Sequence, residues 1–143
     1  MSDIMINFLD VIYQHRIIII VATFVCADTV FGFFRALKLH KFNSSFGIDG
    51  AIRKITMLLS LVFLVILDTA VHINLVGLVP AELLTMIGLE NVGTTEFFGL
   101  LYVSYELVSI LKNLTLCGLP TEKVEKKVRE FLSKYTDELP DID

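Results

Sequence analysis

The chain has 143 residues, of which 55% are hydrophobic and 20% charged, with a formal net charge of −4 and a mean hydropathy of +0.72. Soluble domains contain about 45–50% apolar residues, so this composition excludes an ordinary soluble domain and predicts a small integral membrane protein. Because the hydrophobic runs take up about half of the chain, no length remains for a separate soluble enzyme domain.

The N-terminal segment, about residues 2–15, predicts a short interfacial helix. Ile4, Phe8, Val11 and His15 share one helical face there. The N-terminal sequence MSDIMINFLD has no basic n-region, and we therefore do not expect a cleaved signal peptide.

Three segments have the run of about 20 apolar residues that crosses a bilayer as a helix. The sequence predicts transmembrane helices over about 17–39, 55–79 and 97–117. Pro80 marks the end of the second or the start of a further helix. The alternative is a fourth span over residues 73–89, which would move the C-terminal tail to the outer side.

The distribution of basic residues predicts the orientation. Residues 35–54 hold five Lys or Arg against one Asp, whereas residues 80–96 hold Glu and no Lys or Arg. By the positive-inside rule the first connection, with its turn-rich segment 41–54, is cytoplasmic, so the N-terminus lies outside and the C-terminus inside. We assign the setting of topology to Lys38, Lys41, Arg53 and Lys54.

The C-terminal segment differs sharply from the membrane domain of residues 1–119. Residues 120–143 form a charged tail, predicted to be an amphipathic cytoplasmic helix. Its apolar stripe consists of Val124, Val128, Phe131, Leu132, Tyr135 and Leu139. Its basic residues come first, which favours attraction to anionic lipid; the alternative is a solvated helix that only aids solubility.

Each predicted span carries one carboxylate near its centre. In the third span Glu106 belongs to a polar stripe that also includes Gly99, Tyr102, Ser109 and Asn113 at steps of three and four. Asp28 and Asp68 occupy the other two spans, and we expect all three acids at a similar depth. An ionisable group in lipid costs about 2.5–3.5 kcal/mol, so these acids must be hidden or neutralised.

Several residues are candidates to satisfy these acids. Arg35 is placed to reach Asp28, Gly32 with Ala36 favours close helix contact, and His72 follows Asp68 by one helical turn. The alternative to a functional role is that the polar groups only hold three helices together. The residues predicted to drive assembly or line a pore are Asp28, Gly32, Arg35, Asp68, His72, Tyr102, Glu106, Ser109 and Asn113.

No pattern in the sequence indicates enzymatic chemistry. No motif places a Ser, His and Asp set or a Cys and His pair, and the two Cys lack metal-ligand spacing. We therefore expect no catalytic residue, no metal, no cofactor and no nucleic-acid partner.

An ordered set of short motifs resembles the phage-lysis and toxin-secretion holin family over about residues 20–133. The first span supplies an Asp, then Gly-Phe and a basic exit; a Ser-Ser/Gly loop ends in Arg-Lys; and Glu-x-x-Ser-Ile-x-x-Asn precedes Gly-x-Pro. The residues that carry the resemblance are Asp28, Gly32, Phe33, Arg35, Ala36, Asn43, Ser44, Ser45, Gly47, Gly50, Arg53, Lys54, Asp68, Glu106, Ser109, Ile110, Asn113, Gly118 and Pro120. The chain departs from the family pattern at Lys112, where an acid is common, and at Thr121 or Glu122, where a second Pro is common.

The resemblance implies a protein that accumulates in the bacterial inner membrane, forms homo-oligomers and opens lesions through which endolysin or a large toxin leaves. It also implies an antiholin as a further partner. On this hypothesis Glu106→Leu and Asp68→Leu variants insert but fail to lyse cells. The competing functions are a small proton or cation channel or transporter subunit, using Asp68, His72 and Glu106, and a scaffold that docks a partner through residues 121–139.

Overall fold

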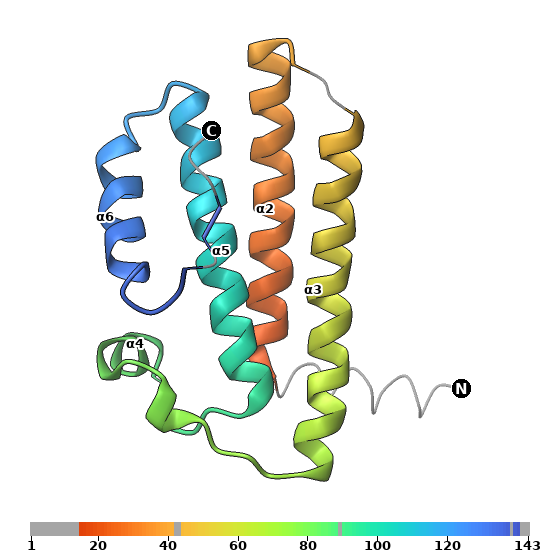
Figure 1. The fold of residues 1–143 in the computed structure, drawn as a ribbon, viewed down its shortest axis with the longest axis vertical. Helices are drawn as coiled ribbons and strands as arrows, with labels where there is room; N and C mark the ends of the chain where they lie inside the picture. Colours follow the sequence, from red (N-terminus) through yellow and green to blue (C-terminus); the bar gives the residue numbers. More distant parts are fainter. Residues whose placement is uncertain (1–14, 42–43, 89, 138, 141–143) are drawn as a thin grey trace.

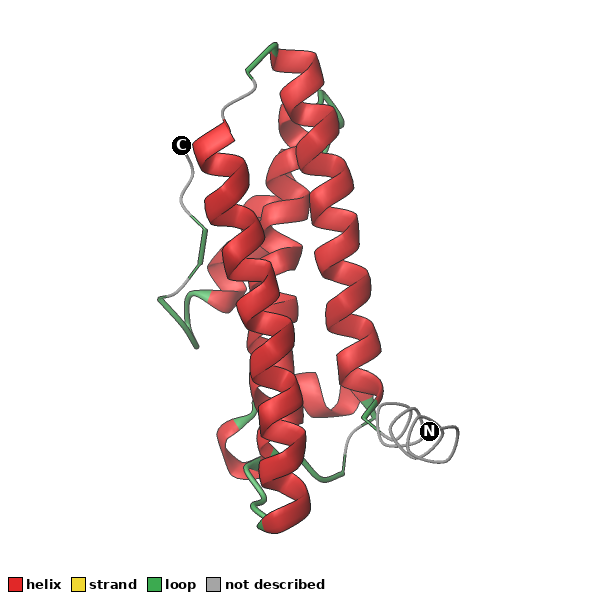
Figure 2. Cartoon of the chain, turned by 90° about the vertical axis from the view of Figure 1, so that its right-hand side faces the viewer, coloured by secondary structure: helices red, strands yellow, loops and turns green. Residues whose placement is uncertain are grey.

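The computed structural model describes the chain except for residues 1–14, 42–43, 89, 138 and 141–143. Its described part is helical and contains no strand (Figure 2). The elements are α2 (Arg16–Leu39), α3 (Ser44–Ala70), the 3₁₀ turn η1 (Val76–Leu78), α4 (Ala81–Ile87), α5 (Thr94–Leu116) and α6 (Glu122–Leu132). The predicted all-helical class is confirmed, while the predicted interfacial helix falls outside the described residues except for His15.

Three helices are long and apolar enough to cross a membrane, as predicted. They are Arg16–Leu39, Gly47–Ala70 and Thr94–Leu116, with mean hydropathies of 2.4, 2.1 and 1.2. The alternative fourth span over 73–89 is not formed in its described part, residues 73–88, which contains only η1 and the seven-residue α4. A helix of seven residues is about 10 Å long, far short of the hydrocarbon core.

The three long helices lie side by side (Figure 1), and α5 packs against both α2 and α3, most extensively against α2. Ile17, Val21 and Val25 follow one another at steps of four on α2 and form a buried cluster with Leu61 of α3. Gly99 of α5 lies directly against this cluster: a Cβ atom there would come within 2.3 Å of Ile17 Cγ1. The absence of a side chain at Gly99 therefore allows α2 and α5 to approach closely.

The second span differs from its prediction, which placed it at 55–79. The helix begins at Ser44, inside the segment expected to be turn-rich, and ends at Ala70. Beyond that end, Asn74 Oδ1 accepts a hydrogen bond from Val76 N–H at 3.0 Å, a side-chain turn that competes with helix. The apolar run continues past Ala70 in the sequence, so hydropathy alone put the helix end too late.

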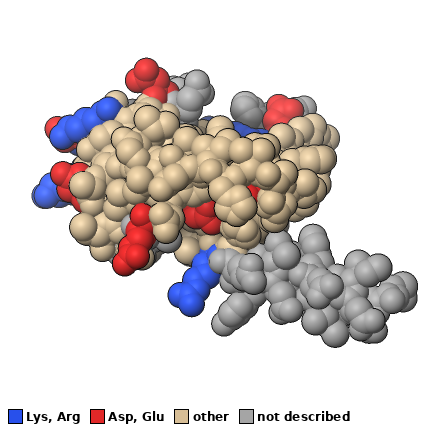
Figure 3. Space-filling view, turned by 90° about the horizontal axis from the view of Figure 1, so that it is seen from below, with Lys and Arg blue, Asp and Glu red and all other residues tan. Residues whose placement is uncertain are grey.

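The outward face of α3 is apolar along its described length. Exposed fractions there range from 54% at Leu59 to 70% at Phe63, and the other members of this face are Ile48, Ile52, Ile55 and Ile66. Such a face is suited to lipid contact. Seen from below, most of the visible surface is uncharged, with charged groups grouped on the left, the side on which Figure 1 places α6 (Figure 3).

Of the amphipathic helix predicted for the tail, the structure forms α6 over Glu122–Leu132, so Tyr135 and Leu139 of the predicted stripe lie beyond the helix end. Helix α6 turns back after α5 and runs beside the C-terminal half of that helix (Figure 1). The Thr115 hydroxyl donates a hydrogen bond to Glu125 Oε2 at 3.1 Å, and Leu132 is buried. The tail is therefore packed on the bundle in this structure.

Candidate intramembrane polar site

Three charged side chains from three helices meet inside the bundle. The ammonium group of Lys54 on α3 lies 2.6 Å from Asp28 Oδ2 on α2 and 3.2 Å from Glu106 Oε2 on α5. Asp28 is 5% exposed and Glu106 0%. This is a buried ion network in which one cation serves two carboxylates.

A fourth residue completes the group, which we call the central network: Asp28, Lys54, Glu106 and Asn113. The amide nitrogen of Asn113 donates to Asp28 Oδ1 at 2.8 Å. Gly32 lies beside this amide, since a Cβ there would be 3.6 Å from Asn113 Nδ2. A methyl group there would make an ordinary van der Waals contact with the amide, so Gly32 lies beside the central network without being required by it.

Two polar atoms of the central network have no hydrogen-bond partner among the described residues. Glu106 Oε1 and Asn113 Oδ1 are buried and accept no hydrogen bond from that part of the chain. When all three ionisable groups are charged, the trio also carries one excess negative charge. Buried charges and unpaired polar atoms are costly unless a partner is supplied, so the network has capacity for a proton or a further donor.

Lys54 was predicted to lie in the cytoplasmic connection and to set topology, and the structure places it in the bundle instead. The buried face of α3 consists of Met57, Leu61 and Val65. Stepping back one helical turn from Met57 reaches Lys54, and stepping forward from Val65 reaches Asp68. The sequence pattern that could have placed Lys54 in the bundle is this stripe of buried positions on α3, because it extends back from Met57 into the segment expected to be turn-rich.

A second group of carboxylates lies at the opposite end of α3, and we call it the α5 cap. Asp68 accepts hydrogen bonds from Thr94 N–H at 3.0 Å, from the Thr94 hydroxyl at 2.6 Å and from Thr95 N–H at 2.8 Å. Glu96 accepts one from Gly93 N–H at 3.1 Å and contacts His15 Nδ1 at 2.8 Å. These acids satisfy the free N–H groups at the start of α5 and complement its dipole.

The expectation of three acids at one depth is therefore wrong for Asp68. Asp28 and Glu106 do share a level through Lys54. Asp68 instead contacts Thr95, which precedes Glu106 by eleven positions, or roughly 16 Å along a helix. The second helix is shifted toward the N-terminus relative to its predicted bounds, and this shift moves Asp68 to the end of the bundle.

The remaining predicted residues occupy separate positions. His72 lies beyond the end of α3, so it does not continue the helical face of Asp68; both line a hollow of about 480 Å³. The Tyr102 hydroxyl is 2.8 Å from the Ser60 hydroxyl, outside the central network. Ser109 and Arg35 are half-buried.

Of the other residues assigned to topology, Lys38 and Lys41 lie near the end of the bundle where α2 stops, whereas Arg53 directly precedes Lys54 at the level of the central network. Lys38 donates a hydrogen bond to the carbonyl oxygen of Cys117, Lys41 is exposed, and the Arg53 guanidinium lies 4.8 Å from the centre of the Tyr105 ring. Across the described residues, no group of three or more His, Cys, Asp or Glu is arranged to hold a metal ion.

Comparisons with known proteins agree with this membrane-spanning arrangement. A model of the bacteriophage holin family matches residues 8–137. A curated relative, the holin-like protein TcdE of Clostridioides difficile, is 41% identical over 127 residues, which cover 88% of this chain and 76% of that protein. No solved structure matches. The family match covers most of the chain and the identity is high, and the chain therefore belongs to the bacteriophage holin family.

Proposed function

We propose that the protein acts as a holin that forms homo-oligomers in the inner membrane of a bacterium and opens lesions there. The proposed lesions dissipate the membrane potential and let endolysin or a large toxin leave the cell. Membership of the holin family supports this role. On this proposal the protein is not an enzyme, and its partners are the bilayer and other copies of itself.

The observation that carries the proposal is the central network. A buried ion pair gains little stability over apolar packing, because desolvation offsets the attraction between the charges. Its members come from three different helices, so Lys54 of one copy can exchange its carboxylate partners for those of a neighbour. In a large ring the same groups would face water, which removes the cost of burying them.

The proposed orientation keeps the N-terminus outside and the C-terminus inside. The ends of α2 and α5 meet where Lys38 contacts the Cys117 carbonyl, and the basic tail follows directly. At the opposite end, residues 71–96 contain Glu82, Glu90 and Glu96 and no Lys or Arg. This asymmetry agrees with the positive-inside rule.

A small proton or cation channel is the second candidate. The buried, unpaired Glu106 Oε1 and Asn113 Oδ1 favour it, since such atoms can accept a proton or coordinate a cation. The two functions differ in the size of what passes. A holin releases an enzyme-sized cytoplasmic protein, whereas a channel collapses ion gradients without releasing protein.

The experiment is inducible expression in a bacterium with and without a co-expressed endolysin, followed by optical density and by release of a cytoplasmic reporter enzyme. We expect abrupt lysis only when both proteins are present. Collapse of the membrane potential without reporter release would contradict the holin proposal and support the channel.

Two variants connect the outcome to the central network. Glu106→Gln removes the carboxylate that shares Lys54 and should insert normally but delay or abolish lysis. Glu82→Gln, an exposed carboxylate on α4, is the matched control and should lyse on the normal schedule. Normal timing by Glu106→Gln would show that the network does not drive lesion formation.

A further inference from the structure

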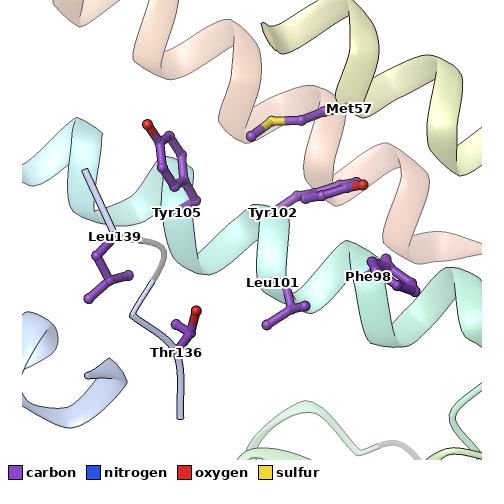
Figure 4. Close-up of a pocket in the computed structure, with 7 residues that line it drawn as sticks. All are labelled: Met57, Phe98, Leu101, Tyr102, Tyr105, Thr136 and Leu139. Carbon is purple, nitrogen blue, oxygen red and sulfur yellow. The ribbon is translucent and has the colours of Figure 1, made fainter. Parts of the chain in front are cut away.

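The position of α6 conflicts with a third span that is surrounded by lipid. After α6 the chain continues along α5, and Thr136 and Leu139 line a pocket of about 320 Å³ together with Leu101 and Tyr105 (Figure 4). Leu101 lies seven positions after Thr94, the first residue of α5. The tail therefore reaches back to the middle of the segment that would cross the bilayer.

The outward side of this tail is charged. The exposed charged residues of the described tail are Glu122, Lys123, Lys126, Lys127, Glu130, Lys134 and Asp137. Charged side chains that face lipid near the bilayer centre are strongly unfavourable. The packed position of α6 is thus compatible with water on that side of α5 and not with hydrocarbon.

Packing on α5 also leaves part of the apolar stripe of α6 uncovered. Val124 is 51% exposed and Tyr135 49% exposed, and the Phe131 ring contacts the Tyr135 ring at 5.4 Å between centroids. Two charged side chains are more covered than these: Glu125, which accepts a hydrogen bond from Thr115 of α5, is 13% exposed, and Arg129, which donates to the Pro140 carbonyl, is 19% exposed. The covered face of α6 therefore includes Leu132 but only part of the apolar stripe.

The uncovered edge is formed by Val124 and Phe131 of α6 and by Tyr135 in the turn just after it, and lysines lie beside it. Lys123 and Lys127 are four positions apart and share the side of α6 next to that edge, and Lys134 follows just after the helix ends at Leu132. An apolar and aromatic edge beside a row of lysines is the pattern of a helix that lies on a bilayer with anionic lipid.

The connection between α5 and α6 is a short turn with two special residues. Gly118 has φ +91°, a conformation that glycine adopts readily and other residues do not. Pro120 follows, before α6 starts at Glu122. A turn of this length lets α6 change direction without altering either helix.

We infer that α6 leaves the flank of α5 when α5 spans a bilayer, and lies on the anionic headgroup surface with Val124, Phe131 and Tyr135 toward the hydrocarbon. The lysines of its exposed side then contact lipid phosphates. This removes the charged side chains from the depth of the span and covers the apolar edge that α5 leaves open.

Double electron–electron resonance on the full chain in vesicles tests this inference. Spin labels are placed at Leu101→Cys and Thr136→Cys, with Cys26→Ser and Cys117→Ser. The two positions line one pocket in the packed state and give a short separation. If α6 instead lies at right angles to α5, each label is about fifteen residues from the turn that joins the two helices. The labels are then roughly 30 Å apart.

We expect the long separation in vesicles of either lipid, because α5 spans both, with a narrower distance distribution in phosphatidylglycerol, where the lysines hold α6 on the headgroups. Changing Lys123, Lys127 and Lys134 together to Gln should broaden the distribution in phosphatidylglycerol, while Lys126→Gln, on the side of the helix away from the apolar edge, should not. A short separation in phosphatidylglycerol overturns the inference. Equal distributions in both lipids also overturn it, because the headgroup charge would then not hold α6. The measurement is independent of lesion formation.

Discussion

The central network and the α5 cap both bury carboxylates, but they satisfy them by different means. In the α5 cap, Asp68 accepts three hydrogen bonds from the first two residues of α5, so its partners belong to a fixed helix end. In the central network, Glu106 depends on one ammonium group that it shares with Asp28. The cap holds a helix in place, whereas the network joins three helices through exchangeable contacts.

This difference assigns separate roles to acids that look alike in the sequence. A carboxylate held by the free N–H groups of a helix end is tied to that helix, because those donors keep fixed positions at its first turn. A carboxylate held by a lysine side chain can exchange it for another cation at the same depth. We therefore expect substitutions in the cap to act on stability and substitutions of Glu106 to act on assembly.

The largest expected effect belongs to Lys54→Met, which leaves Asp28 and Glu106 buried without a cation. Removing one partner of a buried ion network costs about 3–5 kcal/mol. The melting temperature of the purified protein in detergent should fall strongly. Arg53→Met is the matched control: it removes the neighbouring cation, which contacts the Tyr105 ring, and should cost about 1 kcal/mol or less. Equal losses in both variants would contradict a special role for Lys54.

A smaller loss of unfolding free energy is expected from Asp68→Ala, which leaves the N–H groups of Thr94 and Thr95 without their acceptor. Loss of an N-terminal cap costs about 0.5–2 kcal/mol. Thermal unfolding measures the loss, and hydrogen exchange should show faster opening of the first turn of α5 only. Asp49→Ala, exposed on α3, serves as the control and should change neither. Faster exchange throughout α5 would argue against a local cap.

Ser60→Ala removes the hydroxyl group that lies 2.8 Å from the Tyr102 hydroxyl. This pair belongs neither to the central network nor to the α5 cap. A single neutral hydrogen bond contributes about 0.5–1.5 kcal/mol. The double variant with Tyr102→Phe should cost little more than either single variant, because both remove the same bond. Additive losses in this double-mutant cycle would mean that the two hydroxyl groups do not interact.

The smallest effect on stability is expected for Glu106→Gln, although it should disturb lysis most. The substitution leaves Lys54 paired with Asp28 alone and removes the excess negative charge. The change in unfolding free energy should stay within about 1 kcal/mol, since the amide keeps a hydrogen-bond acceptor near Lys54. Unfolding in detergent, measured beside lysis timing, separates the two effects. A large loss of stability would mean that a lysis defect reflects misfolding.

Sequence patterns predicted the helical class, the number of spans and the first span closely. The third helix begins at Thr94, three residues before its predicted start. The second span was predicted too far toward the C-terminus, because apolar residues after Ala70 continue the hydrophobic run without continuing the helix. In the site, the burial of Asp28, Glu106 and Asn113 inside the bundle could be predicted, because polar and ionisable residues in apolar helices avoid lipid. Their partner Lys54 was assigned to a loop.

The sequence by itself determined that this chain enters a membrane as helices, because apolar length and periodicity are local properties. Only the tertiary structure decided which charges meet. Asp28 and Lys54 are 26 positions apart, and Lys54 and Glu106 are 52 apart. Their contact depends on the relative depth and rotation of three helices. A shift of one helix by a few residues changes those partners while leaving its hydropathy almost unchanged, which explains why Asp68 became a cap and Lys54 became the centre of the site.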